Sequence, residues 1–237
     1  MKDFVQYYTE YDEDGRLQRH RTEFAATTYV LDKLIHTGFH ILDVGAGTGA
    51  YSFYYAEKGC SVVAIDAVPK YIEIMRSRLQ SQPDLNIEAF VADIRDLSLP
   101  STTNFDVVLF MGPVYHVPKQ AIKHCLDVCL RVLKTDGILA VSYVNAYEGH
   151  ERDKHADMII FHSPAEIEQL LSEFDLSLIC HNPTDGVVFG ELNELAYGQQ
   201  KEIEELHAWL DKNQHVLYDS EWISSSVHGL YVGRKTI

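Results

Sequence analysis

The chain has 237 residues, of which 46% are hydrophobic and 23% are charged, and its formal net charge at pH 7 is −15. This composition excludes a disordered or fibrous chain, and the length suits one α/β domain with its own core. An acidic surface repels nucleic-acid phosphates and anionic lipid. We therefore expect no membrane partner and disfavour a nucleic-acid partner. The main role that we expect for the acidic charge is to keep the protein in solution.

The cysteines Cys60, Cys125, Cys129 and Cys180 form no C-x-x-C pair, which argues against a disulfide framework. Cys125, Cys129 and the adjacent His124 are too few ligands for a metal ion, so we expect helix packing and predict no metal site. No stretch reaches about 18 apolar residues, and the first residues contain no long apolar segment. We therefore expect a soluble, cytoplasmic protein.

Residues 1–22 are polar and aromatic, with Tyr7, Tyr8 and Tyr11 ahead of an acidic run and then a basic run. One interpretation is an ordinary frayed terminus. The other is an ordered lid over a ligand, and the three tyrosines and the charge reversal favour it.

Residues 22–36 are predicted to form a helix, because Phe24, Thr28, Leu31 and Ile35 lie on one face at helical spacing. Gly38 would cap its carboxyl end. Glu23 lies near its start, where a carboxylate interacts favourably with the helix dipole. A second interpretation makes Glu23 a partner for a cofactor amino group or a substrate proton, and we prefer the first.

The apolar run His40–Val44 predicts a buried strand, and a glycine-rich bend with Gly45, Gly47 and Gly49 follows it. A helix is predicted next, at 51–58. Glycines at such a boundary let bare backbone approach a ligand, and the helix N-terminus directs free N–H groups at it. The pattern predicts a site for a small molecule with a polar or anionic part, whereas a tight turn without a ligand needs fewer glycines.

Two kinds of nucleoside ligand fit this bend. Gly45, Gly47 and Ala50 satisfy the dinucleotide pattern G-x-G-x-x-G/A, and Asp66 stands where a carboxylate binds the ribose. Asp43 separates the two readings, because a carboxylate there repels a pyrophosphate but tolerates a cation such as a sulfonium carrying an amino group.

Strands and helices alternate through the rest of the chain. Further strands are predicted at 62–65, 87–92, 105–111, 138–144, 176–180 and 228–234, and further helices at 69–80, 118–133, 163–174 and 199–212. Pro69 suits a first helical turn, and Ser163 with Glu166 forms the capping-box pattern S-x-x-E.

Two segments carry no recognisable motif. Residues 146–162 are rich in histidine, but His150 and His155 lack the spacing of zinc ligands on a helix, so we expect a loop or helix over the site. Residues 182–197 are expected to form loop and linker.

Strands that alternate with helices imply right-handed crossovers and a parallel, doubly wound sheet. Ligands of such sheets bind beyond the carboxyl ends of the strands. The segments Gly45–Gly49 and Met111–His116, together with Asp66 and Asp93, all fall at those ends, so one sheet edge collects every candidate site residue.

Five motifs in order resemble those of the class I S-adenosylmethionine-dependent methyltransferases that act on small molecules. They are Leu42–Gly49, Ile65-Asp66-Ala67, Ala92-Asp93-Ile94, Phe105–Gly112 and Arg131–Leu139. In the last, Thr135 and Asp136 replace the family's Pro and Gly. The resemblance covers about residues 20 to 235.

The resemblance implies a seven-stranded, Rossmann-like α/β sheet, mostly parallel, whose last strand is antiparallel. It implies a single domain over residues 1–237, with a lid and helix at 1–36 and substrate-side insertions at 146–162 and 182–225. The implied cofactor is S-adenosyl-L-methionine, and the implied reaction moves its methyl group to an oxygen or nitrogen of a small molecule. Neither the acceptor nor the oligomeric state is predicted.

The resemblance also assigns roles toward the cofactor. Asp66 would accept hydrogen bonds from the ribose hydroxyls, and Asp93 from the adenine amino group. Asp43 would hold the glycine bend through backbone N–H groups and reach the methionine ammonium through water. The full cofactor-binding set is Asp43, Gly45, Ala46, Gly47, Gly49, Asp66, Ala67, Asp93, Ile94 and Met111.

Met111–His116 resembles the loop that this fold presents to the transferred methyl group. His116 is a candidate general base, or a histidine that only holds the loop, and Tyr115 would shape the wall of the site. Two rival functions remain at this stage, an NAD-type oxidoreductase and a non-catalytic module that binds S-adenosylmethionine. A tRNA or protein acceptor also stays open.

Overall fold

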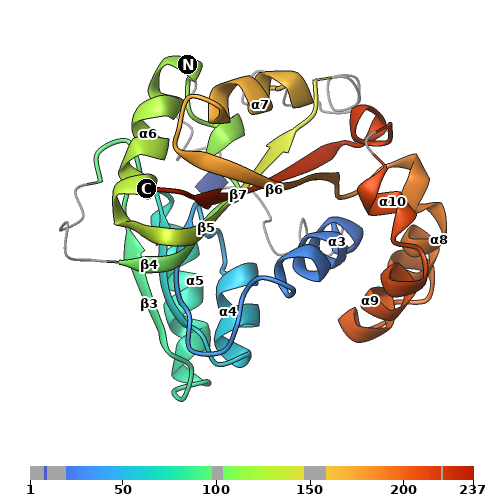
Figure 1. Cartoon of the computed structure of the whole chain (residues 1–237). Helices are drawn as coiled ribbons and strands as arrows, with labels where there is room; N and C mark the ends of the chain where they lie inside the picture. Colours follow the sequence, from blue (N-terminus) through green and yellow to red (C-terminus); the bar gives the residue numbers. More distant parts are fainter. Residues whose placement is uncertain (1–7, 10–19, 98–103, 147–158, 220) are drawn as a thin grey trace.

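The computed structural model describes residues 8–9, 20–97, 104–146, 159–219 and 221–237. Its centre is a seven-stranded sheet in the order β3-β2-β1-β4-β5-β7-β6, with helices on both faces (Figure 1). This is the Rossmann-like arrangement that the motifs predicted.

The strands are β1 (His40–Val44), β2 (Ser61–Asp66), β3 (Ile87–Val91), β4 (Phe105–Phe110), β5 (Leu133–Val144), β6 (Leu176–Pro183) and β7 (His228–Lys235). The first five pair in parallel, and β7 is antiparallel to both β5 and β6. Val44 pairs with Ile65 on one side and with Phe110 on the other, so β1, β2 and β4 end at the same edge. That edge carries the predicted site.

The α-helices are α3 (Arg21–Leu31), α4 (Ala50–Glu57), α5 (Pro69–Gln80), α6 (Lys119–Val132), α7 (Pro164–Leu171), α8 (Gly190–Asn193), α9 (Ile203–Lys212) and α10 (His215–Tyr218). Short turns of other helix types are η1 (Pro113–Tyr115), η3 (Val187–Phe189), η4 (Glu194–Gly198) and η5 (Ile223–Ser225). Buried residues of α3, α4, α8, α9 and α10 share one layer of the core, and those of α6 and α7 share the opposite layer.

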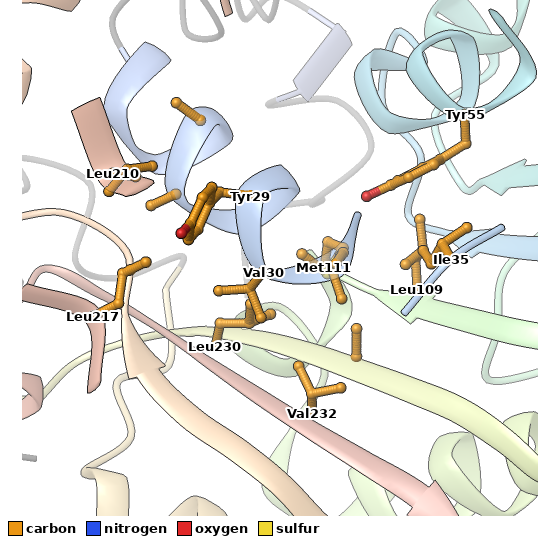
Figure 2. Packing of buried hydrophobic residues seen from close by; sticks show 14 of the residues in the cluster. Tyr29, Val30, Ile35, Tyr55, Leu109, Met111, Leu210, Leu217, Leu230 and Val232 are labelled. Carbon is orange, nitrogen blue, oxygen red and sulfur yellow. The ribbon is translucent and has the colours of Figure 1, made fainter. Parts of the chain in front are cut away.

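Alternation along the strands divides the core into these layers. On β1, Ile41 belongs to the layer under α3 and α4, whereas Leu42 belongs to the layer under α6. Figure 2 shows the first layer, where Val30 of α3 lies close to Leu230 of β7. Both faces of β1 are apolar because both are covered, as is usual for parallel strands.

Several predicted elements have their predicted bounds. Strand β1 and helix α5 coincide with the expected ranges, and Pro69 is the first residue of α5. The capping box at α7 is formed: the Glu166 N–H donates to Ser163 Oγ at 3.3 Å, and the Ser163 N–H donates to Glu166 Oε2 at 2.8 Å. These features depend on neighbouring residues, which the sequence displays directly.

The helix expected at 22–36 is shorter than predicted. Helix α3 ends at Leu31, and Gly38 does not cap it, because its N–H donates instead to the carbonyl of Gly59 at 3.0 Å. Ile35 keeps its place in the core from within the turn that leads into β1. Buried residues continue at helical spacing beyond the end of α3. The spacing of hydrophobic residues therefore predicted a helix longer than the one that forms.

The prediction of a loop at 182–197 is also wrong. Strand β6 continues to Pro183, and the helical turns η3, α8 and η4 follow. Phe189, Leu192 and Ala196 are fully buried among residues of α3 and α9. Turns this short have weak sequence signals, and burial against distant helices holds them in helical form.

Within the described residues, no helix combines the length and the apolar character that a membrane span requires.

Candidate active site

The bend after β1 is built from glycines in left-handed backbone conformations. Gly45, Gly47 and Gly49 have φ of 71°, 57° and 92°, values that residues with a Cβ adopt at a cost. The N–H groups of Gly45 and Ala46 both donate to the carbonyl of Ile65, at 2.8 and 3.0 Å. The bend is therefore fastened to β2 and holds one defined shape.

The bend also lies against the end of β4. A Cβ built on Gly45 would come within 2.9 Å of the Pro113 ring. This close approach leaves the backbone of the bend and the loop after β4 in contact, which explains why glycine is needed at position 45.

Asp66 links the bend to the end of β2. Its Oδ2 accepts from the Gly47 N–H at 2.8 Å, and its Oδ1 accepts from the Val68 N–H at 2.8 Å. Asp66 is the last residue of β2, is largely buried, and is followed by Ala67. Each carboxylate oxygen has a second lone pair. The side chain can thus hold the bend and still accept from a ligand hydroxyl.

Asp43 does not hold the glycine bend, contrary to our expectation. Its Oδ2 accepts from the Ser52 hydroxyl at 2.6 Å, so it ties β1 to the start of α4 instead. The contact with the bend that we assigned to Asp43 is made by Asp66. The strand register sets this outcome, because Asp66 ends the neighbouring strand whereas Asp43 precedes the end of its own.

The environment of Asp43 is unusual for a carboxyl group. Burial raises its pKa to about 7, the hydrogen bond from Ser52 offsets part of this effect, and the negative charge of Asp66 adds to it. None of these influences comes from a cation. A ligand with a positive charge beside Asp43 would favour its ionised form.

Asp93 and Ile94 follow β3 at the same edge. The Asp93 carboxylate is bonded to Arg95, whose Nε lies 2.9 Å from both oxygens and whose backbone N–H lies 2.9 Å from Oδ1. These hydrogen bonds with Arg95 outweigh burial and lower the pKa of Asp93. The Ile94 side chain is buried in the core layer under α6. A ligand at Asp93 would share it with Arg95.

His116 follows the η1 turn at the end of β4, beyond the buried Met111. Its Nε2 lies 3.1 Å from the Tyr8 hydroxyl, and the two rings meet edge to face with centroids 4.9 Å apart. The Tyr115 ring meets it from a second side at 4.5 Å. His116 is thus positioned by two aromatic residues.

The described part of the N-terminal segment spans the site. Besides the contact of Tyr8 with His116, the Thr9 carbonyl accepts from Lys70 Nζ at 2.7 Å. Lys70 lies in the first turn of α5, after β2, and His116 follows β4, so Tyr8 and Thr9 bridge the two elements that flank the bend after β1. Tyr7 and Tyr11, also expected in a lid, lie outside the described residues.

The end of the 146–162 segment packs against η1. The Ile160 N–H donates to the Tyr115 carbonyl at 2.8 Å, and His162 Nε2 lies 3.3 Å from the Val114 carbonyl. Burial lowers the pKa of His162. His150 and His155 lie outside the described residues.

A second polar cluster lies at the same sheet edge, and sequence reasoning missed most of it. His228 Nδ1 lies 2.6 Å from Asp185 Oδ2, and Glu23 Oε2 lies 3.9 Å from that nitrogen and 3.7 Å from His20 Nδ1. Only Glu23 drew attention in the sequence. No spacing signal could have found the cluster, because its members come from α3, the loop after β6 and the start of β7.

The family comparison covers the motif-bearing half of the chain. Residues 41–137 match the methyltransferase domain family. The ubiquinone biosynthesis O-methyltransferase of Xylella fastidiosa (strain M23) is 37% identical over 120 residues, which are 49% of this chain and 46% of that protein. The chain thus aligns with about half the length of this curated relative.

Solved structures extend the likeness to the whole fold. A protein from Pyrococcus horikoshii OT3 has a TM-score of 0.67 at 18% identity, over 98% of this chain and 99% of its own. Magnesium protoporphyrin IX methyltransferase from Synechocystis PCC 6803, with bound S-adenosylhomocysteine, has a TM-score of 0.64 at 13% identity, over 93% and 84%. The motifs and the family match identify residues 41–137 of this chain as a methyltransferase domain, set in the Rossmann-like fold of the solved structures.

Proposed function

We propose that this protein transfers the methyl group of S-adenosylmethionine to an oxygen or nitrogen of a small molecule. The observation that carries the proposal is the pair of buried carboxyls, Asp43 and Asp66, at a left-handed glycine bend, where no cation of the described residues acts on Asp43. A sulfonium with an amino group supplies the missing positive charge. A pyrophosphate would add negative charge to the same place.

The residues at the bend fit such a cofactor. Asp66 is a carboxyl of the kind that accepts from ribose hydroxyls, and Asp43 is poised to ionise beside a cation. We assign contacts along the rest of the cofactor to the remaining members of the predicted set: Gly45, Ala46, Gly47, Gly49, Ala67, Asp93, Ile94 and Met111. When bound, S-adenosylmethionine supplies an electrophilic methyl group on a sulfur that leaves readily.

On the acceptor side, the chain's own task is to orient the nucleophile and take its proton. We assign to His116 the role of general base, which accepts the proton of the nucleophile. The Tyr8 hydroxyl and the Tyr115 ring hold the His116 ring in place. Tyr115 forms part of the wall. If the acceptor atom is an amine that is already unprotonated, His116 only shapes the site.

We further propose that residues 1–237 act as one unit. In it, 1–36 close over the site, and 146–162 and 182–225 select the acceptor. The contacts of Tyr8 and of Ile160 with the η1 region support this division. The acidic charge supports a small acceptor rather than a nucleic acid. The free thiols of all four cysteines suit a cytoplasmic location.

The two rival functions are not favoured. An NAD-type oxidoreductase would bring a pyrophosphate to a bend that already holds two buried carboxyls. A module that binds the cofactor without catalysis would not need a histidine held at the end of β4. The curated relatives named in the comparison are ubiquinone biosynthesis O-methyltransferases, which speaks for the same choice.

Calorimetric titration separates these functions at the level of binding. We expect S-adenosylmethionine and S-adenosylhomocysteine to bind to the full chain at one site, and NADH not to compete. Tight NADH binding with no binding of either sulfur compound would overturn the proposal.

A search for methylated products tests catalysis. Pooled small metabolites are incubated with the protein and methyl-labelled S-adenosylmethionine, and labelled products are identified by mass spectrometry. We expect one labelled product class whose formation needs His116. Binding of the cofactor without any labelled product, across metabolite, tRNA and protein pools, would point to the non-catalytic module.

A further inference from the structure

The cluster of His20, Glu23, Asp185 and His228 is assigned no cofactor contact in the proposed function and calls for its own explanation. His20 and Glu23 stand at the start of α3, and His228 is the first residue of β7. One ligand atom from each of His20, Glu23 and His228 lies within 4.8 Å of the other two. Two imidazoles and a carboxylate converge here from distant parts of the chain.

The spacing of these atoms is close to what a metal ion requires. A four-coordinate zinc ion with bonds of about 2.1 Å holds its ligand atoms about 3.4 Å apart. The separation between His20 Nδ1 and Glu23 Oε2 is 3.7 Å, and the ligand atoms of His20, Glu23 and His228 all lie within 4.8 Å of one another. Side-chain rotations would close the remaining gap.

Asp185 behaves as a supporting carboxylate. Its Oδ1 accepts from the backbone N–H groups of Val227 and His228, each at 2.8 Å, and its Oδ2 contacts the His228 ring at 2.6 Å. Asp185 occupies His228 Nδ1, so a metal ion would take the other ring nitrogen, Nε2, which is the usual division of roles in a metal-binding histidine. The backbone bonds fix Asp185, and Asp185 fixes the ring of His228.

The charges of the cluster also favour a cation. The ion pairs that link Glu23 and Asp185 to described residues all run to histidines, and none runs to a lysine or arginine. Glu23 and His228 are largely buried. Among the described residues, the charged partners of these two carboxylates are imidazoles alone, which leaves negative charge for a divalent ion to neutralise.

We propose that His20, Glu23 and His228 form a binding site for a divalent transition-metal ion, with Asp185 orienting His228. Imidazole and carboxylate ligands without a thiolate suit zinc, and also cobalt or nickel as probes. Three protein ligands leave a coordination position for water or another oxygen ligand. Spacing along the chain gave no hint of this site, because β7 brings His228 to α3 only in the folded protein.

The site has a place beside the proposed acceptor region. His228 pairs with Val144 at the end of β5, which is the neighbour of β4. Two strand spacings, about 10 Å, therefore separate His228 from the line of β4, whose end carries His116. An ion here would fasten the N-terminal helix to the sheet next to that region.

Zinc binding to the full chain is the direct test. Protein freed of metal with a chelator is titrated with Zn²⁺ by calorimetry, and Co²⁺ is used separately for the visible absorption of a tetrahedral site. We expect one ion per chain. His20→Gln and Glu23→Gln should each weaken Zn²⁺ binding at least tenfold, and Asp185→Asn about 10- to 100-fold.

His124→Gln is the matched control, because His124 is exposed on α6 and far from the cluster in the fold. It should bind Zn²⁺ as the unaltered chain does. Absence of stoichiometric binding, or equal binding by His20→Gln and the unaltered chain, would overturn the proposal. His20 is partly exposed, so its replacement tests the site without threatening the core.

The result is independent of methyl transfer. S-adenosylhomocysteine affinity of the variants, measured in the same preparations, reports whether the cofactor site is intact. Loss of Zn²⁺ binding with retained cofactor binding supports the metal site alone. Retained Zn²⁺ binding in both ligand variants rejects it, whatever the protein does with its cofactor.

Discussion

At the scale of single residues, the site depends on carboxyl groups whose surroundings differ. Asp66 is fixed by two backbone N–H groups, and Asp93 is neutralised by Arg95, but Asp43 is buried with only Ser52 as a donor. Burying a carboxylate without a cation is costly, so Asp43 retains its proton to about pH 7. A buried carboxyl group that lowers the stability of the ligand-free protein, and that a cationic ligand would stabilise, is typical of a binding site.

Replacing Asp43 should reveal this cost in the dependence of stability on pH. The folded chain holds the Asp43 proton up to about pH 7, whereas the unfolded chain releases it near its usual value of 3.8. Asp43 therefore lowers stability as the pH rises through this window. The free energy of unfolding of Asp43→Asn relative to the unaltered chain should grow by roughly 2–3 kcal/mol between pH 5 and pH 8. Urea unfolding at both pH values measures it, and an unchanged difference would contradict the assignment.

The same group should couple cofactor binding to proton release. At pH 6 the empty protein carries a proton on Asp43, and a bound sulfonium would expel it. Titration of S-adenosylmethionine in buffers of different ionisation enthalpy should show release approaching one proton per site at pH 6, falling toward zero at pH 9. Asp43→Asn should bind more weakly and release none. Equal proton release by the two proteins would place the titrating group elsewhere.

His116 should matter for turnover and not for cofactor affinity. General-base groups contribute about 10²–10⁴ in rate, so His116→Ala should lower kcat on a hydroxyl acceptor by at least 10². Tyr8→Phe removes only the hydroxyl that lies 3.1 Å from the ring and should have a smaller effect. Both variants should bind S-adenosylhomocysteine normally. Full turnover by His116→Ala would leave His116 as a loop residue only.

At the scale of elements, the bend between β1 and α4 connects three strands. Its N–H groups donate to Ile65 at the end of β2 and to Asp66, while Gly45 lies against Pro113 after β4. The bend thus sets the relative positions of the tips of β1, β2 and β4. A change in the bend should affect stability and the cofactor site together.

Gly45→Ala tests this connection. The left-handed φ of 71° costs a residue with a Cβ about 1–2 kcal/mol, and the Cβ would also stand 2.9 Å from the Pro113 ring. We expect a loss of roughly 2–3 kcal/mol in the free energy of unfolding and at least a tenfold loss in cofactor affinity. Gly190→Ala is the control, because a Cβ there meets open space at the start of α8. It should leave the affinity unchanged and stability unchanged or slightly higher.

At the scale of the whole molecule, the sheet order decides which residues meet. The crossover from β3 to β4 reverses the direction in which the sheet grows, so β1 lies inside the sheet with β2 and β4 beside it. The antiparallel β7 enters between β5 and β6 and carries His228 to the same edge. Two polar centres therefore share one edge of a sheet, although their residues span most of the chain.

A ligand that binds across these tips should stabilise the entire fold. At a concentration of S-adenosylhomocysteine one hundred times its Kd, mass action adds about 2.7 kcal/mol to the folded state. For a chain of this size the unfolding midpoint should rise by about 5–10 °C. Differential scanning fluorimetry measures the shift. NADH at the same concentration should cause none.

The features that could be predicted from the sequence alone are those that depend on residues close together in the chain. The glycine bend, Pro69 and the capping box of Ser163 and Glu166 all act between neighbours in the chain, and each has the form that was predicted. The helical turns of 187–198 were missed, because burial of Phe189 and Leu192 against distant helices creates them. Asp136 stands where the family has a glycine, and its backbone has the left-handed φ of 63°. Asparagine and aspartate tolerate this conformation better than most residues, so the replacement keeps the local backbone shape.

The sequence by itself determined the fold and the sheet edge that gathers the candidate site, including the carboxyls Asp43, Asp66 and Asp93, because hydrophobic period and glycine spacing are written along the chain. Tertiary structure alone decided that Asp66 rather than Asp43 holds the bend, and that Tyr8 reaches His116. It also alone decided that His20, Glu23, Asp185 and His228 meet. These contacts join residues that only strand order and register bring together, and no local pattern encodes them.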